Sequence, residues 1–275
     1  MAGRGAAFFD LDKTLIEGSS AVHFARAAYK GGMVSRRRLA SDLWANIRFR
    51  LQGSTDQATD ELRERILEAI AGQRVVDLAR LGPDVLAGVL PLLYREVLDE
   101  AYAHQDAGRR AYIVTAASQE LADVLAHVLV LDGGIGMRSE IADGVYTGRP
   151  AGPFTYREGK ADAIRELAAQ EEIDLSDSYA YSDSESDLPM LRAVGNPVAV
   201  NPDATLERVA REEGWEVIRL DRARDARRRT RRPGHDPPHR VSHPGTRPRE
   251  RPPPQRPHHG RAPRCPLPPG PALVG

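Results

Sequence analysis

Residues 8–14 read FFDLDKT and place two carboxylates, Asp10 and Asp12, one residue apart directly after an apolar pair. The short apolar run AAFF (6–9), followed at once by polar residues, predicts a buried strand that ends near Asp10. The two like charges repel each other, and a buried strand would be more stable with an apolar residue at either position. We therefore expect the pair to serve a chemical role.

Charge and proline are unevenly distributed along the 275 residues. From Arg222 onward there are fourteen arginines and three acidic residues, a net charge of +11, whereas residues 1–221 carry a net charge of −11. The same tail holds fourteen of the 21 prolines and few aliphatic residues. Such a segment cannot bury enough apolar surface to fold. We expect an acidic folded body followed by a disordered basic tail, 222–275.

Cysteine usage and apolar run lengths bear on the compartment. Cys265 is the single cysteine, so no disulfide can form within one chain. The first residues meet acidic side chains before any signal-type apolar segment develops. No apolar run reaches the roughly 18 residues of a membrane-spanning helix. These features predict a cytoplasmic protein without a membrane span.

Residues 19–90 have helical patterns and no strand patterns. Serine residues precede the first two predicted helices and glycines follow all three, as is common at helix ends. The predicted helices cover residues 19–29, 35–53 and 55–71. This stretch is interpreted as an all-helical insertion after the first strand.

From Pro91 to residue 221, helical and strand patterns alternate. Asp143-Gly144 is a dipeptide favoured in tight hairpins. We predict helices at 91–108, 118–131, 157–170, 187–193 and 203–213, and strands at 111–115, 178–182, 197–200 and 215–220. Alternation of this kind predicts an α/β fold with a doubly wound, mostly parallel sheet.

Six polar residues fall where the predicted strands end or the following helices begin: Asp10, Asp12, Thr115, Lys160, Asp183 and Asp187. Ligands of an open α/β sheet bind beyond the carboxyl ends of its strands. Four carboxylates in one cleft would be destabilising unless cations share it. Mg²⁺ prefers oxygen ligands of this kind, and Lys160 would add positive charge.

These residues carry a family resemblance. The segments DLDKT (10–14), the strand ending in Thr115, Lys160, and SDSESD (182–187) match in order the four motifs of the haloacid dehalogenase-like hydrolases. Residues 6–220 resemble the subgroup that includes the phosphoserine phosphatases. The resemblance implies a Rossmann-like catalytic core, residues 1–18 and 91–221, with a helical cap, residues 19–90. The tail lies outside it.

The resemblance also implies a role for each aspartate. Asp10 would be the nucleophile that forms an aspartyl-phosphate intermediate. Asp12 would protonate the leaving group and then activate water. Asp10, the main-chain carbonyl of Asp12, and Asp183 would hold Mg²⁺, and Asp187 would complete its surroundings through water.

Thr115 and Lys160 would bind the transferring phosphoryl oxygens. Each residue alone has a plainer interpretation. Asp10 could cap a turn, Thr115 could end a strand, and Asp183 and Asp187 could charge the first turn of a helix. Their occurrence together, in this order, favours the catalytic interpretation.

The sequence says less about the substrate. The leading hypothesis is a Mg²⁺-dependent phosphatase acting on a small phosphorylated metabolite, and the alternative is phosphoserine phosphatase. That enzyme typically has a glutamate nine residues after the nucleophile, where this chain has Ser19, although Glu17 is nearby. Cap side chains that could contact an anionic or aromatic substrate, or form a solvated face and a core anchor, are Arg36, Arg37, Arg38, Trp44, Arg48 and Arg50.

Two non-enzymatic hypotheses are set beside the phosphatase. One is a phosphate-binding module without turnover, which the intact Asp10 and Asp12 pair disfavours. The other is a nucleic-acid-binding protein that uses the basic tail, which lacks aromatic residues for base stacking. His23, His104 and His127 lie on separate predicted helices and are expected at the surface or in packing roles. The oligomeric state is not indicated.

Overall fold

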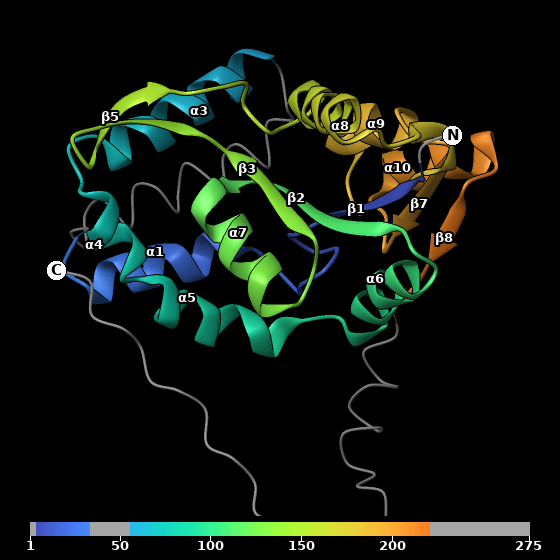
Figure 1. Ribbon diagram of the computed structural model, residues 1–275, viewed down its shortest axis with the longest axis horizontal. Helices are drawn as coiled ribbons and strands as arrows, with labels where there is room; N and C mark the ends of the chain where they lie inside the picture. Colours follow the sequence, from blue (N-terminus) through green and yellow to red (C-terminus); the bar gives the residue numbers. More distant parts are fainter. Residues whose placement is uncertain (1–3, 34–55, 221–275) are drawn as a thin grey trace, which may run out of the picture. The chain divides into compact units, whose positions relative to one another are not determined.

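The strand predicted from the FFD segment lies at the centre of the sheet in a computed structural model, which describes residues 4–33 and 56–220. Strand β1 (Ala6–Asp10) is fully buried and lies between β2 (Arg110–Ser118) and β6 (Tyr179–Ser182). The six-stranded order is β3-β2-β1-β6-β7-β8, and every pairing is parallel (Figure 1). The predicted α/β fold class is confirmed.

The remaining elements alternate along the chain as expected for parallel strands. The other strands are β3 (Gly133–Met137), β7 (Asn196–Val200) and β8 (Glu216–Ile218). The helices that alternate with these strands are α6 (Arg95–Asp106), α7 (Gln119–Val128), α8 (Glu158–Glu171), α9 (Leu188–Arg192) and α10 (Ala204–Glu213). Short 3₁₀ turns cover Leu90–Leu92 (η1), Leu175–Asp177 (η2) and Glu185–Asp187 (η3).

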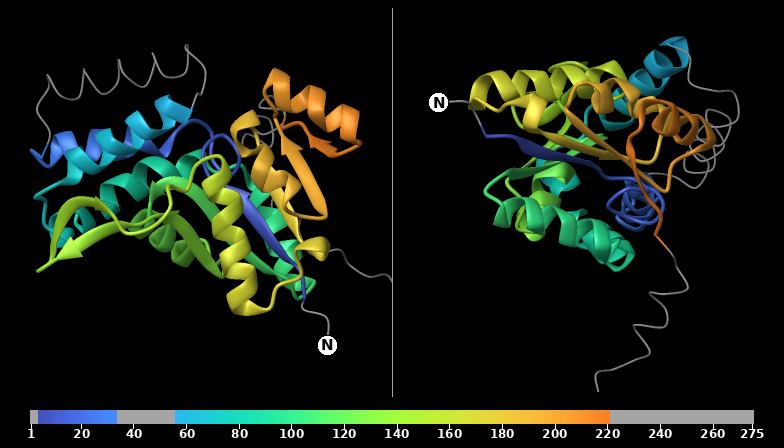
Figure 2. Two further views of the ribbon diagram at one scale, coloured as in Figure 1. Left: turned by 90° about the horizontal axis from the view of Figure 1, so that it is seen from above. Right: turned by 90° about the vertical axis from the view of Figure 1, so that its right-hand side faces the viewer.

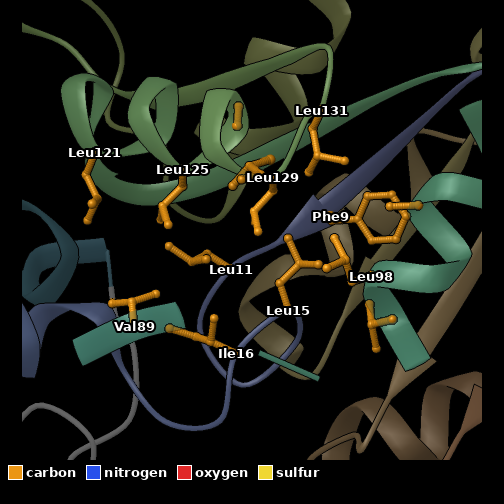
Figure 3. Close-up of a cluster of buried hydrophobic side chains, with 14 of the residues drawn as sticks. Phe9, Leu11, Leu15, Ile16, Val89, Leu98, Leu121, Leu125, Leu129 and Leu131 are labelled. Carbon is orange, nitrogen blue, oxygen red and sulfur yellow. The ribbon is translucent and has the colours of Figure 1, made fainter. Parts of the chain in front are cut away.

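Two apolar layers cover the sheet, because successive side chains of β1 point to opposite faces. Phe8 belongs to the layer formed with α8, α9 and α10, which includes Ile164, Leu191 and Leu206. Phe9 belongs to the opposite layer, formed with α6 and α7, which includes Leu98 and Leu125 (Figure 3). Figure 2 shows helices on both faces. Each buried phenylalanine contributes roughly 2 kcal/mol through lost apolar exposure.

The described part of the predicted insertion is helical. It contains α1 (Ser20–Lys30), α3 (Asp56–Ile70), α4 (Val75–Ala79) and α5 (Gly82–Val89). The apolar layer around Phe9 continues into α1 and α5, and it includes Leu11 and Ile16 of the segment after β1 (Figure 3). The helix predicted at 35–53 lies outside the described residues.

A hairpin formed by β4 (Ser139–Ala142) and β5 (Val145–Pro150) turns at Asp143-Gly144, as predicted. Both turn residues have positive φ, 51° and 75°. The hairpin bonds to the segment between α3 and α4: the Tyr146 carbonyl accepts from the Gly72 amide at 2.9 Å, and the Gly144 carbonyl accepts from the Val75 amide at 3.0 Å. The hairpin, which follows β3 in the chain, is thus attached to the helical insertion.

Two sequence predictions for this part of the chain are wrong. No strand was predicted at β3, although it forms the edge of the sheet beside β2. The helix predicted to begin at Pro91 begins at Arg95 instead. Leu93 forms a bridge with Ile16, and the Tyr94 amide donates to the Leu15 carbonyl at 2.9 Å. These tertiary contacts hold Leu93 and Tyr94, between η1 and α6, in extended conformation.

None of the helices in the described ranges 4–33 and 56–220 is long and apolar enough to cross a membrane. The predicted disordered tail, 222–275, lies outside those ranges.

His104 of α6 has the packing role expected from the sequence. The residue is 8% exposed, and its Nε2 lies 2.8 Å from the Tyr181 hydroxyl. Its ring packs against the ring of Tyr179, with centroids 4.5 Å apart. Burial lowers the pKa of His104, and the nearby Arg109 guanidinium lowers it further. The folded protein therefore holds this imidazole neutral.

We predict that His104 makes the folded state sensitive to acid. Because its folded pKa lies below the ordinary value of 6.5, its contribution to stability is complete above that pH and is lost as pH falls through the folded pKa. His104→Gln should reduce the decline in the free energy of unfolding between about pH 7 and about pH 5, measured by urea denaturation. His127→Gln, at an exposed position, is the control. Equal pH dependence in both variants would contradict the prediction.

Candidate active site

The candidate site begins where β1 ends. Asp10 is the last residue of β1 and is 6% exposed. A tight turn follows, with Lys13 at a φ of 64° and the Leu15 amide donating back to the Leu11 carbonyl at 3.1 Å. The turn keeps Asp12 at the carboxyl end of the sheet, where ligands of such folds bind.

The Asp12 carboxylate is bound by the start of the helical insertion. Its Oδ1 accepts from the Ser20 amide and its Oδ2 from the Ser19 hydroxyl, both at 2.8 Å. Ser20 is the first residue of α1. The carboxylate therefore lies at the amino terminus of that helix, where the helix dipole favours negative charge.

Lys160 enters the site from the first turn of α8. Gly159 permits this turn because a Cβ there would collide with the Phe154 carbonyl. The Lys160 side chain is buried, and its Nζ donates to Asp10 Oδ1 at 2.5 Å and to Asp187 Oδ2 at 2.7 Å. One ammonium thus joins the end of β1 to the segment after β6.

Asp183 and Asp187 lie in that segment, and both are buried. The Asp187 carboxylate accepts a second hydrogen bond at Oδ2, from the Ser182 hydroxyl at 2.7 Å. Asp183 Oδ2 lies 3.5 Å from Lys13 Nζ. The carbonyl of Asp183 accepts from the Asp203 amide at 2.8 Å, which fixes the main chain at the end of β6.

Thr115 comes from the strand on the other side of β1. Asp10 pairs with Val114 in the parallel register, so Thr115 lies one residue beyond the level of Asp10. Thr115 is 3% exposed, and its Oγ1 accepts from the Ala117 amide at 3.1 Å. The hydroxyl is therefore held at the same sheet end as Asp10.

Carboxylates outnumber buried cations in the site. Burial raises the pKa of Asp10 to about 8; Lys160 opposes this rise, and Asp187 and Asp183 add to it. Burial also raises the pKa of Asp183 to about 6, against the effect of Lys13. Burial alone would lower the pKa of Lys160, but Asp10 and Asp187 outweigh it and hold the pKa above its usual value. Lys160 is therefore charged, and the raised pKa of Asp10 shows that its ionised form would be stabilised by additional positive charge in the site.

The residues fit a hard divalent cation in part. The donors are oxygens, which Mg²⁺ prefers, and Asp187 Oδ1 is buried without a hydrogen-bond partner in the described structure. Within residues 4–33 and 56–220, however, no three acidic, histidine or cysteine side chains form a metal cage by themselves. A bound cation would also need main-chain, water or ligand oxygens.

The structure brings together most of the residues predicted from the sequence. Asp10, Lys160 and Asp187 are directly hydrogen-bonded, and Asp183 is close enough to affect the pKa of Asp10. Thr115 lies at the same sheet end by strand register. The cap arginines and Trp44 considered above lie outside the described residues.

Sequence reasoning missed the roles of Ser19 and Ser182. Ser182 belongs to the SDSESD segment, and its position at the last residue of a strand was a usable signal. No local signal indicated that Ser19 would donate to Asp12, because that contact depends on how α1 packs.

The sequence profile of the haloacid dehalogenase-like hydrolases matches residues 7–192, which contain every site residue described above. The chain belongs to this family. The resemblance inferred from the four motifs is therefore confirmed.

Curated relatives in this family have several names. Phosphoserine phosphatase SerB1 of Mycobacterium tuberculosis is 40% identical over 81% of this chain and 73% of its own length. The inhibition of morphological differentiation protein of Streptomyces azureus is 37% identical over 86% of this chain and 85% of its own length. Histidinol-phosphatase of Neisseria meningitidis is 30% identical over 78% of this chain and 98% of its own.

Solved structures share the fold. A Bordetella pertussis protein of unknown function is 32% identical, with a TM-score of 0.68 over 78% of this chain and 98% of its own. A phosphoserine phosphatase solved as a phospho-aspartyl intermediate analogue is 17% identical, with a TM-score of 0.57 over 82% of this chain and 99% of its own. At that identity the likeness concerns the fold alone.

We predict that the two lysines of the site differ sharply in their effect on stability. Lys160→Met leaves Asp10 and Asp187 buried without their cation and should lower the free energy of unfolding by about 3 kcal/mol. Lys13→Met removes a cation whose side chain is 53% exposed and should cost less than about 1 kcal/mol. Urea denaturation of both variants in EDTA measures the difference. Similar losses would show that the buried pairs do not stabilise the site.

Proposed function

We propose that this chain hydrolyses a small phosphomonoester, with Asp10 as the nucleophile and Asp12 as the general acid and base. Its family and its phosphatase-named relatives make it a hydrolase acting on phosphoric monoesters. The observation that supports these roles best is the buried Asp10–Lys160–Asp187 cluster at the end of the central strand, with Asp12 two residues from Asp10.

In the first step, an Asp10 oxygen forms a bond to phosphorus while the bond from phosphorus to the ester oxygen breaks. The leaving oxygen takes a proton from Asp12 and departs as the alcohol. Lys160 offsets the charge of the nucleophile and the phosphoryl oxygens, and the Thr115 hydroxyl donates to one of those oxygens.

In the second step, Asp12 removes a proton from water, and the water oxygen forms a bond to phosphorus. The bond between phosphorus and the Asp10 oxygen breaks, which restores the Asp10 carboxylate and releases phosphate. Asp12 returns to its protonated form, and a new cycle can begin. Its hydrogen bonds from Ser19 and Ser20 would hold its carboxylate in place in both steps.

Phosphatases of this family generally depend on Mg²⁺, and Asp10, Asp183 and the main-chain carbonyl of Asp12 would hold the ion here. When bound, it would supply positive charge against the phosphoryl oxygens. Asp187, with one buried oxygen unpartnered in the described structure, would accept a hydrogen bond from water in the same region.

A cavity of about 560 Å³ adjoins Asp183 and has room for a small ester. Lys13, Glu17 and Tyr94 are among the residues that line it. Phosphoserine is a second candidate substrate, because a relative that is 40% identical is named phosphoserine phosphatase. Against it, Ser19 replaces the glutamate expected at its position and donates its hydroxyl to Asp12. We therefore infer a small metabolite phosphate and place phosphoserine second.

We predict magnesium-dependent hydrolysis of p-nitrophenyl phosphate that requires Asp10. Asp10→Asn removes the nucleophilic charge and should lower kcat by at least about 10³-fold. EDTA should abolish the wild-type activity, and added Mg²⁺ should restore it. The control Asp174→Asn changes a carboxylate that accepts hydrogen bonds within its own turn, including two from Ser176, and should leave the rate unchanged. Turnover that survives both EDTA and Asp10→Asn would refute the mechanism.

We predict that Ser19 acts on the acid rather than on the substrate. Ser19→Ala removes one of two hydrogen bonds to Asp12 and should lower kcat by about tenfold for every ester. KM should change little for p-nitrophenyl phosphate, phosphoserine and histidinol phosphate alike. Ser176→Ala, which removes a hydroxyl from η2, is the control. A rise in KM for phosphoserine alone would instead assign Ser19 to substrate recognition.

A further inference from the structure

The regular pairing of β2 with β3 is interrupted immediately after the level of Asp10. Their parallel register runs regularly to Val114↔Ile135 and resumes only at Ser118↔Met137. Residues Thr115–Ala117 of β2 therefore face a single residue of β3, Gly136. Thr115 is the first residue of a segment of β2 that is not regularly paired with β3.

The side chain of Gln119 restores hydrogen bonding at this gap. Its Nε2 donates to the Gly134 carbonyl at 2.8 Å, and its Oε1 accepts from the Gly136 amide at 2.9 Å. One primary amide thus bonds to two backbone groups of β3 as a neighbouring strand would. Nε2 also donates to Asp123 Oδ1 at 2.8 Å, which fixes the amide orientation.

Close approach of β3 to the start of α7 makes this arrangement specific. A Cβ at Gly136 would lie 2.7 Å from the Ser118 carbonyl oxygen and 2.8 Å from Gln119 Cα. Ser118 caps α7 by accepting from the Leu121 amide. The end of the Thr115–Ala117 segment is therefore fixed by both the helix cap and the Gln119 amide.

The orientation of the Thr115 hydroxyl depends on this segment. Its Oγ1 accepts from the Ala117 amide at 3.1 Å. The hydroxyl hydrogen is therefore left to point toward another acceptor. A shift of Ala117 would change the direction in which that hydrogen can be donated, and hydrogen-bond strength falls steeply with angle.

We propose that Gln119 is a positioning residue: by bridging the gap between β2 and β3, it fixes the Thr115 hydroxyl for donation to the transferring phosphoryl group. This inference rests on the proposed phosphatase function. Gln119 itself touches neither the substrate nor the reacting atoms.

The test compares Gln119→Ala with wild type in kcat and KM for p-nitrophenyl phosphate and in the inhibition constant for orthovanadate, an analogue of the transferring phosphoryl group. We expect kcat to fall by about tenfold and the inhibition constant for vanadate to rise by about tenfold. These changes are smaller than those caused by removing a catalytic hydrogen-bond donor outright, because the Thr115 hydroxyl is still present. KM should stay within about twofold of wild type. A loss of folded protein alone would lower kcat and leave the vanadate constant unchanged, which would overturn the proposal.

Gln105→Ala is the matched control. Gln105, in α6, also donates its side-chain amide to a segment outside its own helix: to the Val130 carbonyl at 3.0 Å and to Asp132 at 2.8 Å. It has no contact with the segment after Thr115 in these hydrogen bonds. This variant should leave the vanadate constant unchanged. An equal rise in both variants would overturn the proposal.

A double-variant cycle with Thr115→Ala tests the route of the effect. If Gln119 acts through Thr115, Gln119→Ala should have little further effect on kcat or on vanadate binding in the Thr115→Ala background. Additive effects would show another route and overturn the proposal. Gln119→Met, which keeps the length of the side chain and removes its hydrogen bonds to Gly134 and Gly136, should raise the vanadate constant as the alanine variant does, and it replaces that variant if the latter does not fold.

The wild-type protein separates this inference from the proposed function. Vanadate binding is measured by calorimetry without turnover. Wild type that binds vanadate but hydrolyses no ester would contradict the phosphatase proposal, and the Gln119 comparison would still decide the positioning role. Active wild type with an unaltered Gln119→Ala variant would overturn only the positioning role.

Discussion

The buried ammonium of Lys160 between Asp10 and Asp187 is the interaction on which the site depends. Removing three charges from water is costly, and such a cluster persists only where its partners are held in place. Here each partner comes from a different element: the end of β1, the first turn of α8, and η3. Parallel strand order brings these ends to one edge of the sheet. The fold thus assembles charges that no local segment could hold together.

The apolar layers keep this edge rigid. Phe8 and Phe9 anchor β1 to opposite helical layers, so the strand that ends in Asp10 cannot shift toward either face. Gly159 allows α8 to begin close enough for Lys160 to reach Asp10. Asp12 is held differently, by the first residues of α1 rather than by the sheet. Asp10, the proposed nucleophile, is therefore fixed by the core, whereas Asp12, the proposed acid and base, is held by the first residues of the helical insertion.

The sequence predicted the elements whose signals are local, and it failed where tertiary contacts decide. The apolar run before Asp10 and the alternation after Pro91 correctly predicted a parallel sheet. Strand β3 was missed because three of its five residues are glycine, which has little strand propensity. Two of these glycines are explained by α7, since a Cβ at Gly134 would collide with Ala122 and a Cβ at Gly136 would collide with Gln119. The helix predicted at 91–108 is present, but its predicted start at Pro91 was wrong because Leu93 pairs with Ile16, a contact that no propensity encodes.

The first turn of α7 connects the sheet end beside Thr115 to the helical insertion. Glu120 follows Gln119 and accepts a hydrogen bond at 2.7 Å from the hydroxyl of Tyr146, which is 2% exposed. Tyr146 belongs to the hairpin that bonds through its backbone to Gly72, beyond the end of α3. The insertion is therefore joined to the same helical turn that holds β3 beside Thr115. Because closely packed elements transmit displacement, a movement of the insertion would act on the sheet end that holds Thr115 as well as on Asp12. Under the proposed mechanism, substrate contacts made far from phosphorus would then bear on both Asp12 and Thr115, the two groups proposed to act beside Asp10.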